Sequence, residues 1–221
     1  MSGYSFDLYG AGLTALGSGA LWWPERQALC VSDLHLGKSE RIARRGGAAL
    51  PPYETRDTLA RLASDLDRTG ARTVICLGDS FDDPLAMQAL PRQDRLWIST
   101  LQAGRRWIWI EGNHDPGPVD LSGTHLAELS LGPLQFRHIA AAEAKGEVSG
   151  HYHPKVRLRL RGRALQRPAF LLDRDRLILP AYGTYTGGLF CDRPPLADLI
   201  GDPGLAILTG AQPRAVPMPR S

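Results

Sequence analysis

The stretch Ala28-Leu29-Cys30-Val31-Ser32-Asp33-Leu34-His35 joins a short apolar run to a polar cluster. Apolar runs recur at residues 74–77, 107–110 and, more weakly, 148–149, and glycine and polar residues follow each of them. Runs of four apolar residues are typical of strands that are buried on both faces, as in parallel sheets. The pattern therefore predicts buried strands whose carboxyl ends carry polar side chains.

Helical patterns separate these runs. In residues 53–68, leucines recur at helical spacing, and Gly70 follows as a stop signal. A second helix is expected over residues 91–101. The order strand, helix, strand, helix, strand predicts parallel βαβ units.

The second half of the chain has a different pattern. In residues 156–161, valine and leucine alternate with arginine, which predicts a half-exposed strand. Further strand-like runs lie at residues 169–172 and 177–179. We therefore predict an α/β fold in which two mixed sheets pack face to face and are flanked by helices.

Length and composition suit one domain over residues 1–221. Proline and glycine accumulate near the end, so residues from about 205 to 221 are expected to form a looser tail. Hydrophobic residues make up 43% and charged residues 22%, which is ordinary for a globular protein and argues against a disordered chain. The net charge of +3 and the pI of about 8.9 are compatible with a polyanionic substrate.

The compartment follows from what the sequence lacks. The three cysteines are odd in number and irregularly spaced, which argues against a disulfide framework. There is no basic-then-apolar leader and no apolar run long enough to cross a bilayer. A cytoplasmic protein without a membrane partner is therefore expected.

The polar clusters are the candidate site. They read Ser32-Asp33-Leu34-His35, Gly78-Asp79, Glu111-Gly112-Asn113-His114-Asp115 and Gly150-His151-Tyr152-His153. The carboxyl ends of strands in an open α/β sheet face one crevice, so the clusters are expected to converge. Their oxygen and imidazole donors suit Mg, Mn, Zn or Fe, and the absence of cysteine disfavours a structural zinc site. The sequence therefore predicts a site for divalent cations.

The spacing within the clusters adds detail. Asp33 and His35 lie two residues apart and would share a face of a regular strand, and His151 and His153 repeat this spacing. Asp-x-His or Gly-Asp alone is usually only a turn. Gly-Asn-His-Asp is more specific, because turn chemistry does not require the histidine. The four clusters together, each at a strand end, favour a metal site over four turns.

At this point the sequence resembles the calcineurin-like metallophosphoesterases, whose blocks are Asp-x-His, Gly-Asp, Gly-Asn-His-Asp/Glu, a lone His and Gly-His-x-His. The resemblance implies a four-layer α-β-β-α sandwich of two mixed sheets flanked by helices. One metal ion would take Asp33, His35 and His153, the other Asn113, His138 and His151, and Asp79 would bridge both. The lone histidine is placed at His138; His125 is its rival, but lies in a Gly/Ser-rich segment and is expected at the surface.

The resemblance also implies catalytic roles and a cofactor. Two cations about 3.5–4 Å apart share a hydroxide and lower its pKa towards neutrality. His114 would act as the general acid towards the leaving oxygen, and Asp115 would orient His114. Manganese is the expected metal, with Mg, Zn, Fe and Ni as alternatives.

Further motifs are similar to the DNA ligase-associated metallophosphoesterases of bacterial DNA-damage-response clusters. They include a basic segment after the first cluster, an arginine-rich strand after the last, and residues 179–188. The resemblance implies a DNA phosphodiesterase or endonuclease beside a DNA ligase, a helicase and a nuclease. The candidate DNA-binding residues are Lys38, Arg41, Arg44, Arg45, Arg157, Arg159 and Arg161.

Two other functions fit the same motifs. One is a small-molecule nucleotide phosphodiesterase or pyrophosphatase, for which the basic residues would only be solvated faces. The other is a non-catalytic scaffold on the same fold, which the complete set of ligand positions disfavours. The sequence predicts no oligomeric state.

Overall fold

The computed structural model describes residues 2–47, 51–117, 121–160 and 163–220, and it leaves out the side chains of residues 84, 159, 160, 163 and 164. The first sheet has the order β1 to β7 along the chain. Its strands are β1 (Gly3–Leu8), β2 (Ala11–Leu16), β3 (Leu21–Trp23), β4 (Ala28–Val31), β5 (Thr73–Leu77), β6 (Arg106–Ile110) and β7 (Thr124–Leu126). The pairs β4–β5, β5–β6 and β6–β7 are parallel, and the remaining pairs are antiparallel.

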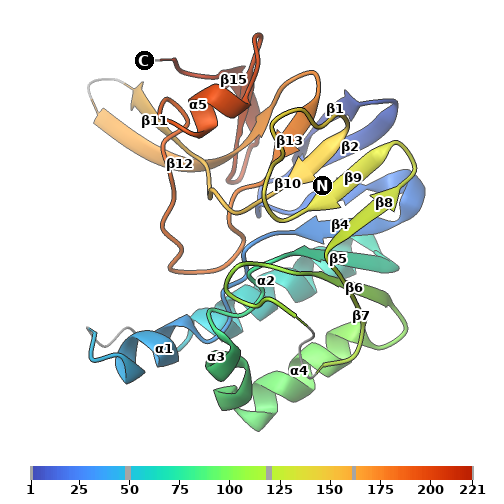
Figure 1. Ribbon diagram of the computed structural model, residues 1–221, viewed down its shortest axis with the longest axis vertical. Coiled ribbons are helices and arrows are strands. Elements are labelled where there is room, and N and C mark those ends of the chain that lie inside the picture. Colours follow the sequence, from blue (N-terminus) through green and yellow to red (C-terminus); the bar gives the residue numbers. More distant parts are fainter. Residues whose placement is uncertain (1, 48–50, 118–120, 161–162, 221) are drawn as a thin grey trace.

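The second sheet is also mixed, with the order β15-β14-β12-β13-β10-β9-β8, and β11 pairs with β12. Its strands are β8 (Glu128–Leu131), β9 (Leu134–Arg137), β10 (Glu147–Ser149), β11 (Lys155–Leu160), β12 (Arg163–Leu172), β13 (Arg176–Ile178), β14 (Leu205–Leu208) and β15 (Arg214–Pro217). Strand β10 is parallel to both β9 and β13. The β11–β12 hairpin projects from the body of the protein (Figure 1).

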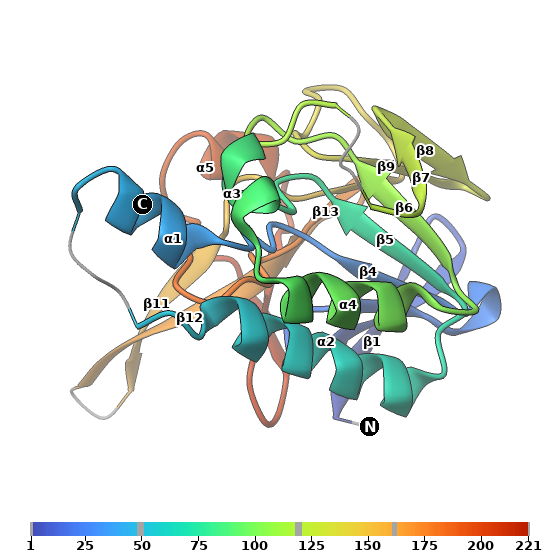
Figure 2. The same ribbon diagram turned by 90° about the horizontal axis from the view of Figure 1, so that it is seen from below.

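The helices lie outside the sheets, as a four-layer sandwich requires (Figure 1). They are α1 (Lys38–Arg44), α2 (Glu54–Thr69), α3 (Pro84–Ala89), α4 (Arg92–Gln102) and the short α5 (Leu196–Leu199), with a 3-10 turn, η1, at Pro24–Arg26. Figure 2 shows α2 and α4 side by side across the first sheet. Among the described residues, no helix combines the length and the apolar character that a membrane crossing requires.

Three hydrophobic clusters of described residues fill the three spaces between the four layers. The largest joins the inner faces of the two sheets, for example Ile75 and Ile108 with Phe136 and Phe170. The second packs the first sheet against α2 and α4, and the third packs the second sheet against α5. Because β4, β5 and β6 contact an apolar layer on each side, their sequences are continuously apolar.

The predicted strands and helices at the centre of the fold are confirmed, and so is the four-layer sandwich. Helix α2 buries Leu59, Leu62 and Leu66 and ends at Gly70, which is left-handed and donates its N–H to the Leu66 carbonyl. The predicted tail is wrong, because β14 and β15 belong to the second sheet. Proline and glycine mark the turns around these strands, while Ala206 and Ile207 pack into the core.

Candidate metal centre

Three parallel strands of the first sheet and two parallel strands of the second end close to one another. Asp33, Asp79 and Asn113 follow β4, β5 and β6 of the first sheet. His138 and His151 follow β9 and β10 of the second sheet. The two sheets therefore bring donors from distant parts of the sequence to a common edge.

The first group of donors is Asp33, His35 and His153, whose ligand atoms all lie within 4.8 Å of one another. His153 Nε2 is 3.1 Å from Asp33 Oδ1 and 3.4 Å from His35 Nε2. Two ligands bonded to one cation at about 2.1 Å lie about 3.0–3.4 Å apart, so this spacing fits a single ion. Asp33 Oδ1 is buried and has no hydrogen-bond partner, which also fits a donor that awaits a cation.

The second group is Asp79, His138 and His151, joined by Asn113. His138 Nε2 lies 3.2 Å from His151 Nδ1, 3.4 Å from Asp79 Oδ2 and 3.0 Å from Asn113 Oδ1. Its other ring nitrogen, Nδ1, is 2.8 Å from the Leu77 carbonyl, a contact that turns Nε2 towards the group. The four predicted donors thus converge as the first three do.

Asp79 stands between the two groups. Its Oδ2 is 3.4 Å from His138 Nε2 in the second group and 4.0 Å from His35 Nε2 in the first. Its Oδ1 accepts a hydrogen bond of 2.8 Å from the His114 backbone N–H. One carboxylate is therefore within reach of both donor groups.

The ligand loops have an unusual backbone. Eight non-glycine residues among those described have positive φ, and five of them are candidate ligands: Asp33, His35, Asp79, His151 and His153. Such conformations are unfavourable and persist where the surroundings impose them, commonly at functional sites. The expectation that Asp33 and His35 share the face of a regular strand is therefore wrong, because the strand ends at Val31 and left-handed turns aim both side chains.

Two glycines allow the loops to approach closely, as the sequence indicated. A Cβ at Gly150 would lie 1.7 Å from Ser32 Oγ and 2.7 Å from Asp33 Oδ2. A Cβ at Gly112 would lie 2.1 Å from the Asp79 backbone nitrogen. Any side chain at either position would push a candidate ligand out of place.

Sequence reasoning missed Asp82. This residue is fully buried, and its Oδ1 lies 2.9 Å from His35 Nδ1. A carboxylate behind a ligating histidine fixes the ring and strengthens it as a ligand. His35, Asp82 and His114 also have donor atoms within 4.8 Å of one another. The signal was the acidic residue three positions after Asp79 in the same loop.

The role predicted for Asp115 needs correction. Its Oδ2 accepts hydrogen bonds from the backbone N–H groups of Ser80 and Phe81, so Asp115 holds the loop that carries Asp79. The ring of His114 is oriented instead by the Asp82 carbonyl, 2.9 Å from Nδ1. Its Nε2 lies 4.0 Å from Asp79 Oδ2, beside both donor groups.

The electrostatics keep the carboxylates ionised. Burial raises the pKa of Asp79, but the contact with His138 and the His114 N–H lower it further, to about 2. Burial likewise opposes ionisation of Asp33, yet its contact with His153 leaves the pKa of Asp33 below the usual value. Burial and the nearby His138 lower the pKa of His151, which favours the neutral, ligating ring.

The basic residues of α1 and of its C-cap, Arg45, are largely neutralised. Lys38 and Arg41 contact the Asp82 carboxylate, and Arg44 and Arg45 contact Asp83. These basic side chains therefore hold α1 against the loop after β5.

The basic residues of β11 are more open. Arg157 is exposed, and its guanidinium stacks over the Phe190 ring at 4.3 Å. The side chain of Arg159 and all of Arg161 lie outside the described residues.

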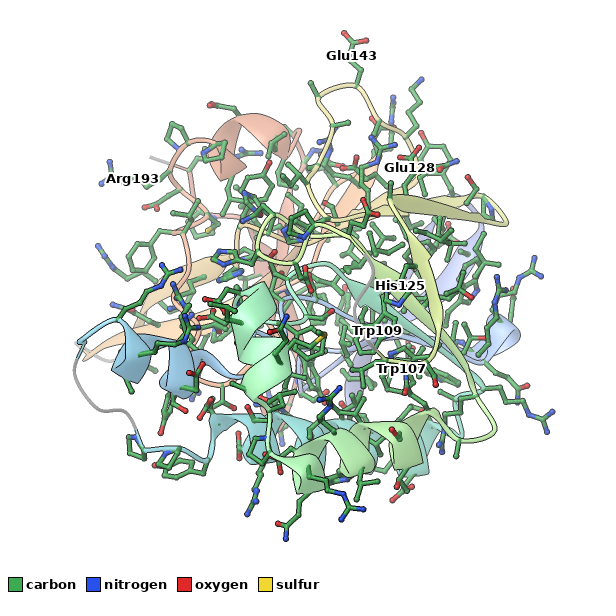
Figure 3. The ribbon with its side chains drawn as sticks, turned by 60° about the horizontal axis from the view of Figure 1, so that its bottom comes forward. Trp107, Trp109, His125, Glu128, Glu143 and Arg193 are labelled. Carbon is green, nitrogen blue, oxygen red and sulfur yellow. The ribbon has the colours of Figure 1, made fainter. Side chains whose placement is uncertain are left out.

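His125 is not part of the centre. It lies in β7 rather than in a loop, and its ring stacks on Trp109 with centroids 6.4 Å apart (Figure 3). Trp109 in turn packs into the core between the first sheet and its helices. His138, not His125, meets the other donors.

Two hollows on the surface are candidates for the place where the substrate binds. One of about 360 Å³ borders the second group and is lined by Glu111, Gly112, Asn113, Ala127, Arg137, His138 and Ile139. A larger one of about 670 Å³ lies on α4 and contains none of the donors. Chemistry is therefore expected at the smaller hollow, where the donors lie.

Comparison with known proteins agrees with this geometry. The family model for calcineurin-like phosphoesterases matches residues 27–202. Among solved structures, the nuclease MPE of Pseudomonas putida is similar, with 28% identity, a TM-score of 0.75, and coverage of 96% of this chain and 100% of that chain. No curated protein matches. The chain therefore belongs to the calcineurin-like phosphoesterases, metal-dependent hydrolases of phosphate esters.

Proposed function

We propose that the protein is a phosphodiesterase with two metal ions, and that its substrate is DNA. The observation that carries the dinuclear centre is the position of Asp79 Oδ2, 3.4 Å from His138 and 4.0 Å from His35. Asp33, His35 and His153 would hold one cation, and Asn113, His138 and His151 the other. Manganese is the proposed metal, because mixed oxygen and imidazole donors suit it.

When bound, two cations activate a water molecule and neutralise the charge of the phosphate. The protein's own residues hold the donors in place and supply one proton to the leaving group. His114 Nδ1 donates to the Asp82 carbonyl, so Nε2 is the atom that can carry a mobile proton. Because Nε2 lies beside both groups, we assign it to protonation of the leaving oxygen.

Several observations support DNA as the substrate. The similar solved structure is that of a nuclease. The β11–β12 hairpin projects into solvent, and it carries the exposed Arg157 and Arg167 beside Lys155 (Figure 1). Exposed cations along an edge are suited to the phosphates of a nucleic acid strand. We place the protein in a ligase-associated DNA repair system with a helicase and a nuclease, in the cytoplasm, where its three free cysteines stay reduced.

A small nucleotide is the second candidate substrate. The cations of α1, expected to contact DNA, are paired with Asp82 and Asp83 and offer little free charge. A mononucleotide diester needs only the donor groups and the hollow beside His138. The hairpin would then have no role in turnover.

The test is a matrix of metals and substrates. Purified protein with Mn, Mg, Zn, Fe or Ni is assayed on single-stranded, duplex and nicked DNA, on cyclic nucleotides and on a chromogenic diester. We expect Mn-dependent DNA cleavage that chelator and His114→Ala abolish. Turnover of small diesters with every DNA form intact would contradict the DNA substrate, and fewer than one equivalent of bound metal under saturating Mn would favour a scaffold.

A charge-reversal pair separates the two substrates. Arg157→Glu with Arg159→Glu should weaken DNA cleavage and reduce its salt dependence, but leave the chromogenic diester unaffected. Equal losses on both substrates would favour the small nucleotide.

A further inference from the structure

Two tyrosines that contact each other, Tyr53 and Tyr185, belong to none of the three hydrophobic clusters of described residues. Tyr53 is 56% exposed and Tyr185 is half-buried. Their ring centroids are 6.0 Å apart and their planes are tilted by 54°. Packing of the core therefore does not account for this aromatic surface, which we name the tyrosine pair.

The segment that carries Tyr185 borders the first donor group. The Gly183 N–H donates to the Asp33 carbonyl at 3.0 Å. At the other end of the segment, a Cβ at Gly188 would lie 2.1 Å from the His153 carbonyl oxygen. Residues 183–188 thus join the backbones of two candidate ligands, and Tyr185 is only two residues, at most about 7 Å of chain, from Gly183.

The backbone at Tyr185 is unfavourable, with φ of 64° in a bulky residue. It shares this left-handed region with the five candidate ligands. The neighbouring Thr184 keeps it there: its backbone N–H donates to Thr58 Oγ1, and its hydroxyl donates to Asp57 Oδ2 at 2.5 Å. An unfavourable backbone conformation that neighbouring residues impose is common at functional sites. The conformation of Tyr185 therefore indicates that the position of its ring matters for function.

Tyr53 has an equally uncommon location. It occupies the N-cap of α2 and makes no capping hydrogen bond with its side chain. Serine, threonine, aspartate and asparagine are preferred there, because their side chains accept a hydrogen bond from the helix. The helix therefore gains no cap from this side chain. Tyr53 instead lies against its partner ring, and the contact with Tyr53 raises the pKa of Tyr185 to about 12.

We propose that the tyrosine pair is a stacking platform for an unpaired nucleobase next to the phosphate held at the metal centre. This inference rests on the proposed nuclease function and adds residues that select the substrate. An exposed aromatic face stacks on any base, so the platform would favour unpaired over paired nucleotides without reading sequence. A base in a duplex already has its faces covered and would gain nothing.

The experiment measures both binding and turnover. A single-stranded oligonucleotide with one 2-aminopurine is titrated with the Mn-loaded His114→Ala protein, and quenching of the fluorescent base reports stacking. In the otherwise wild-type protein, kcat and KM are measured on an intact oligonucleotide, on one with an abasic residue, and on a chromogenic diester. Tyr185→Leu, Tyr53→Leu and the corresponding Phe variants are compared. Tyr9→Leu is the control, because Tyr9 is 42% exposed and bonded to Asp175, away from the centre.

We expect each Leu variant to abolish quenching and raise KM for the intact oligonucleotide about 5- to 150-fold, the range of base stacking. The Phe variants should behave as wild type, because they keep the ring. The chromogenic diester and the abasic oligonucleotide should be unaffected. Unchanged Mn content and melting temperature would show that the variants are folded.

Other outcomes overturn the proposal in distinguishable ways. If all variants cleave the oligonucleotide as the wild type does, the platform is overturned but the nuclease function is not. Equal losses on the chromogenic diester would make the tyrosines structural. A wild-type protein that neither binds nor cleaves any strand would overturn the nuclease function and the platform with it.

Discussion

His35 Nδ1 lies 2.9 Å from a carboxylate oxygen of Asp82, while its Nε2 faces His153 Nε2 at 3.4 Å. The ring is thus held from behind and directed into the first donor group. Asp82 is fully buried, and Lys38 and Arg41 hold its charge in place. Contacts of this kind contribute to metal affinity without touching the ion.

We therefore expect Asp82→Asn to weaken the first cation site about 10- to 100-fold and to spare the second. Metal-free protein is titrated with Mn in a calorimeter, and the binding curve should contain one weakened class of site. Asp83→Asn is the matched control, because Asp83 caps α3 and contacts Arg44 rather than a donor. Identical affinities for the two variants would contradict the role of Asp82.

Gly150 offers a test of close packing. A Cβ there would lie 1.7 Å from Ser32 Oγ, so Gly150→Ala should displace Ser32 and Asp33 and lower the amount of bound metal by at least one equivalent. Elemental analysis of the purified protein measures this loss. Gly187→Ala is the control, because a Cβ at Gly187 meets nothing within 4 Å. Full metal content in Gly150→Ala would mean that the ligand loops can shift apart.

The parts of the fold that the sequence predicts well are those with strong periodicity. Strands β4, β5 and β6 are continuously apolar because they are covered on both faces, and α2 has a regular leucine stripe. Strands β14 and β15 were missed because each has four residues and lies among prolines and glycines. Short strands depend on their partners more than on their own residues.

The features of the site also fall into those that the sequence predicts and those that it does not. Candidate ligands were predicted from residue type and position after a strand, and they converge here because the strands are parallel. The left-handed turns at Asp33 and His35 could not be predicted, because tertiary contacts impose them on residues that do not prefer them. The contact of His114 with the Asp82 carbonyl was equally hidden, since any residue supplies a carbonyl group.

His114→Ala separates proton transfer from metal binding. Because His114 Nε2 is assigned to the leaving oxygen, kcat for a diester with a poor leaving group should fall about 10²- to 10⁴-fold. A p-nitrophenyl diester, whose leaving group needs no proton, should be affected much less. The comparison of the two substrates is the measurement, with metal content determined in parallel.

His125→Ala is the control for this substitution, because His125 stacks on Trp109 away from the donors. It should leave both substrates and the metal content unchanged. Loss of metal from His114→Ala would instead make His114 a ligand together with His35 and Asp82, the other donor set within 4.8 Å.

Tyr182 connects the chain just before residues 183–188 to α2 and gives the fold a measurable dependence on alkaline pH. Its hydroxyl donates to Asp65 Oδ2 at 2.9 Å, and both side chains are buried. Tyr182→Phe leaves that carboxylate oxygen without its donor, so the free energy of unfolding should fall by about 1–3 kcal/mol near pH 7. Urea denaturation measures the difference.

The sign of the pH effect follows from the shifted pKa of the same residue. Burial, and then the charge of Asp65, raise the pKa of Tyr182 far above its ordinary value of 10.0. Below pH 10 the hydroxyl is protonated in both states, so the hydrogen bond contributes fully. Above pH 10 the unfolded chain loses this proton and the folded protein keeps it, so the advantage of the wild type over Tyr182→Phe should shrink by about 1.4 kcal/mol per pH unit. A difference between the two proteins that stays constant from pH 8 to 11 would mean that Tyr182 ionises equally in both states.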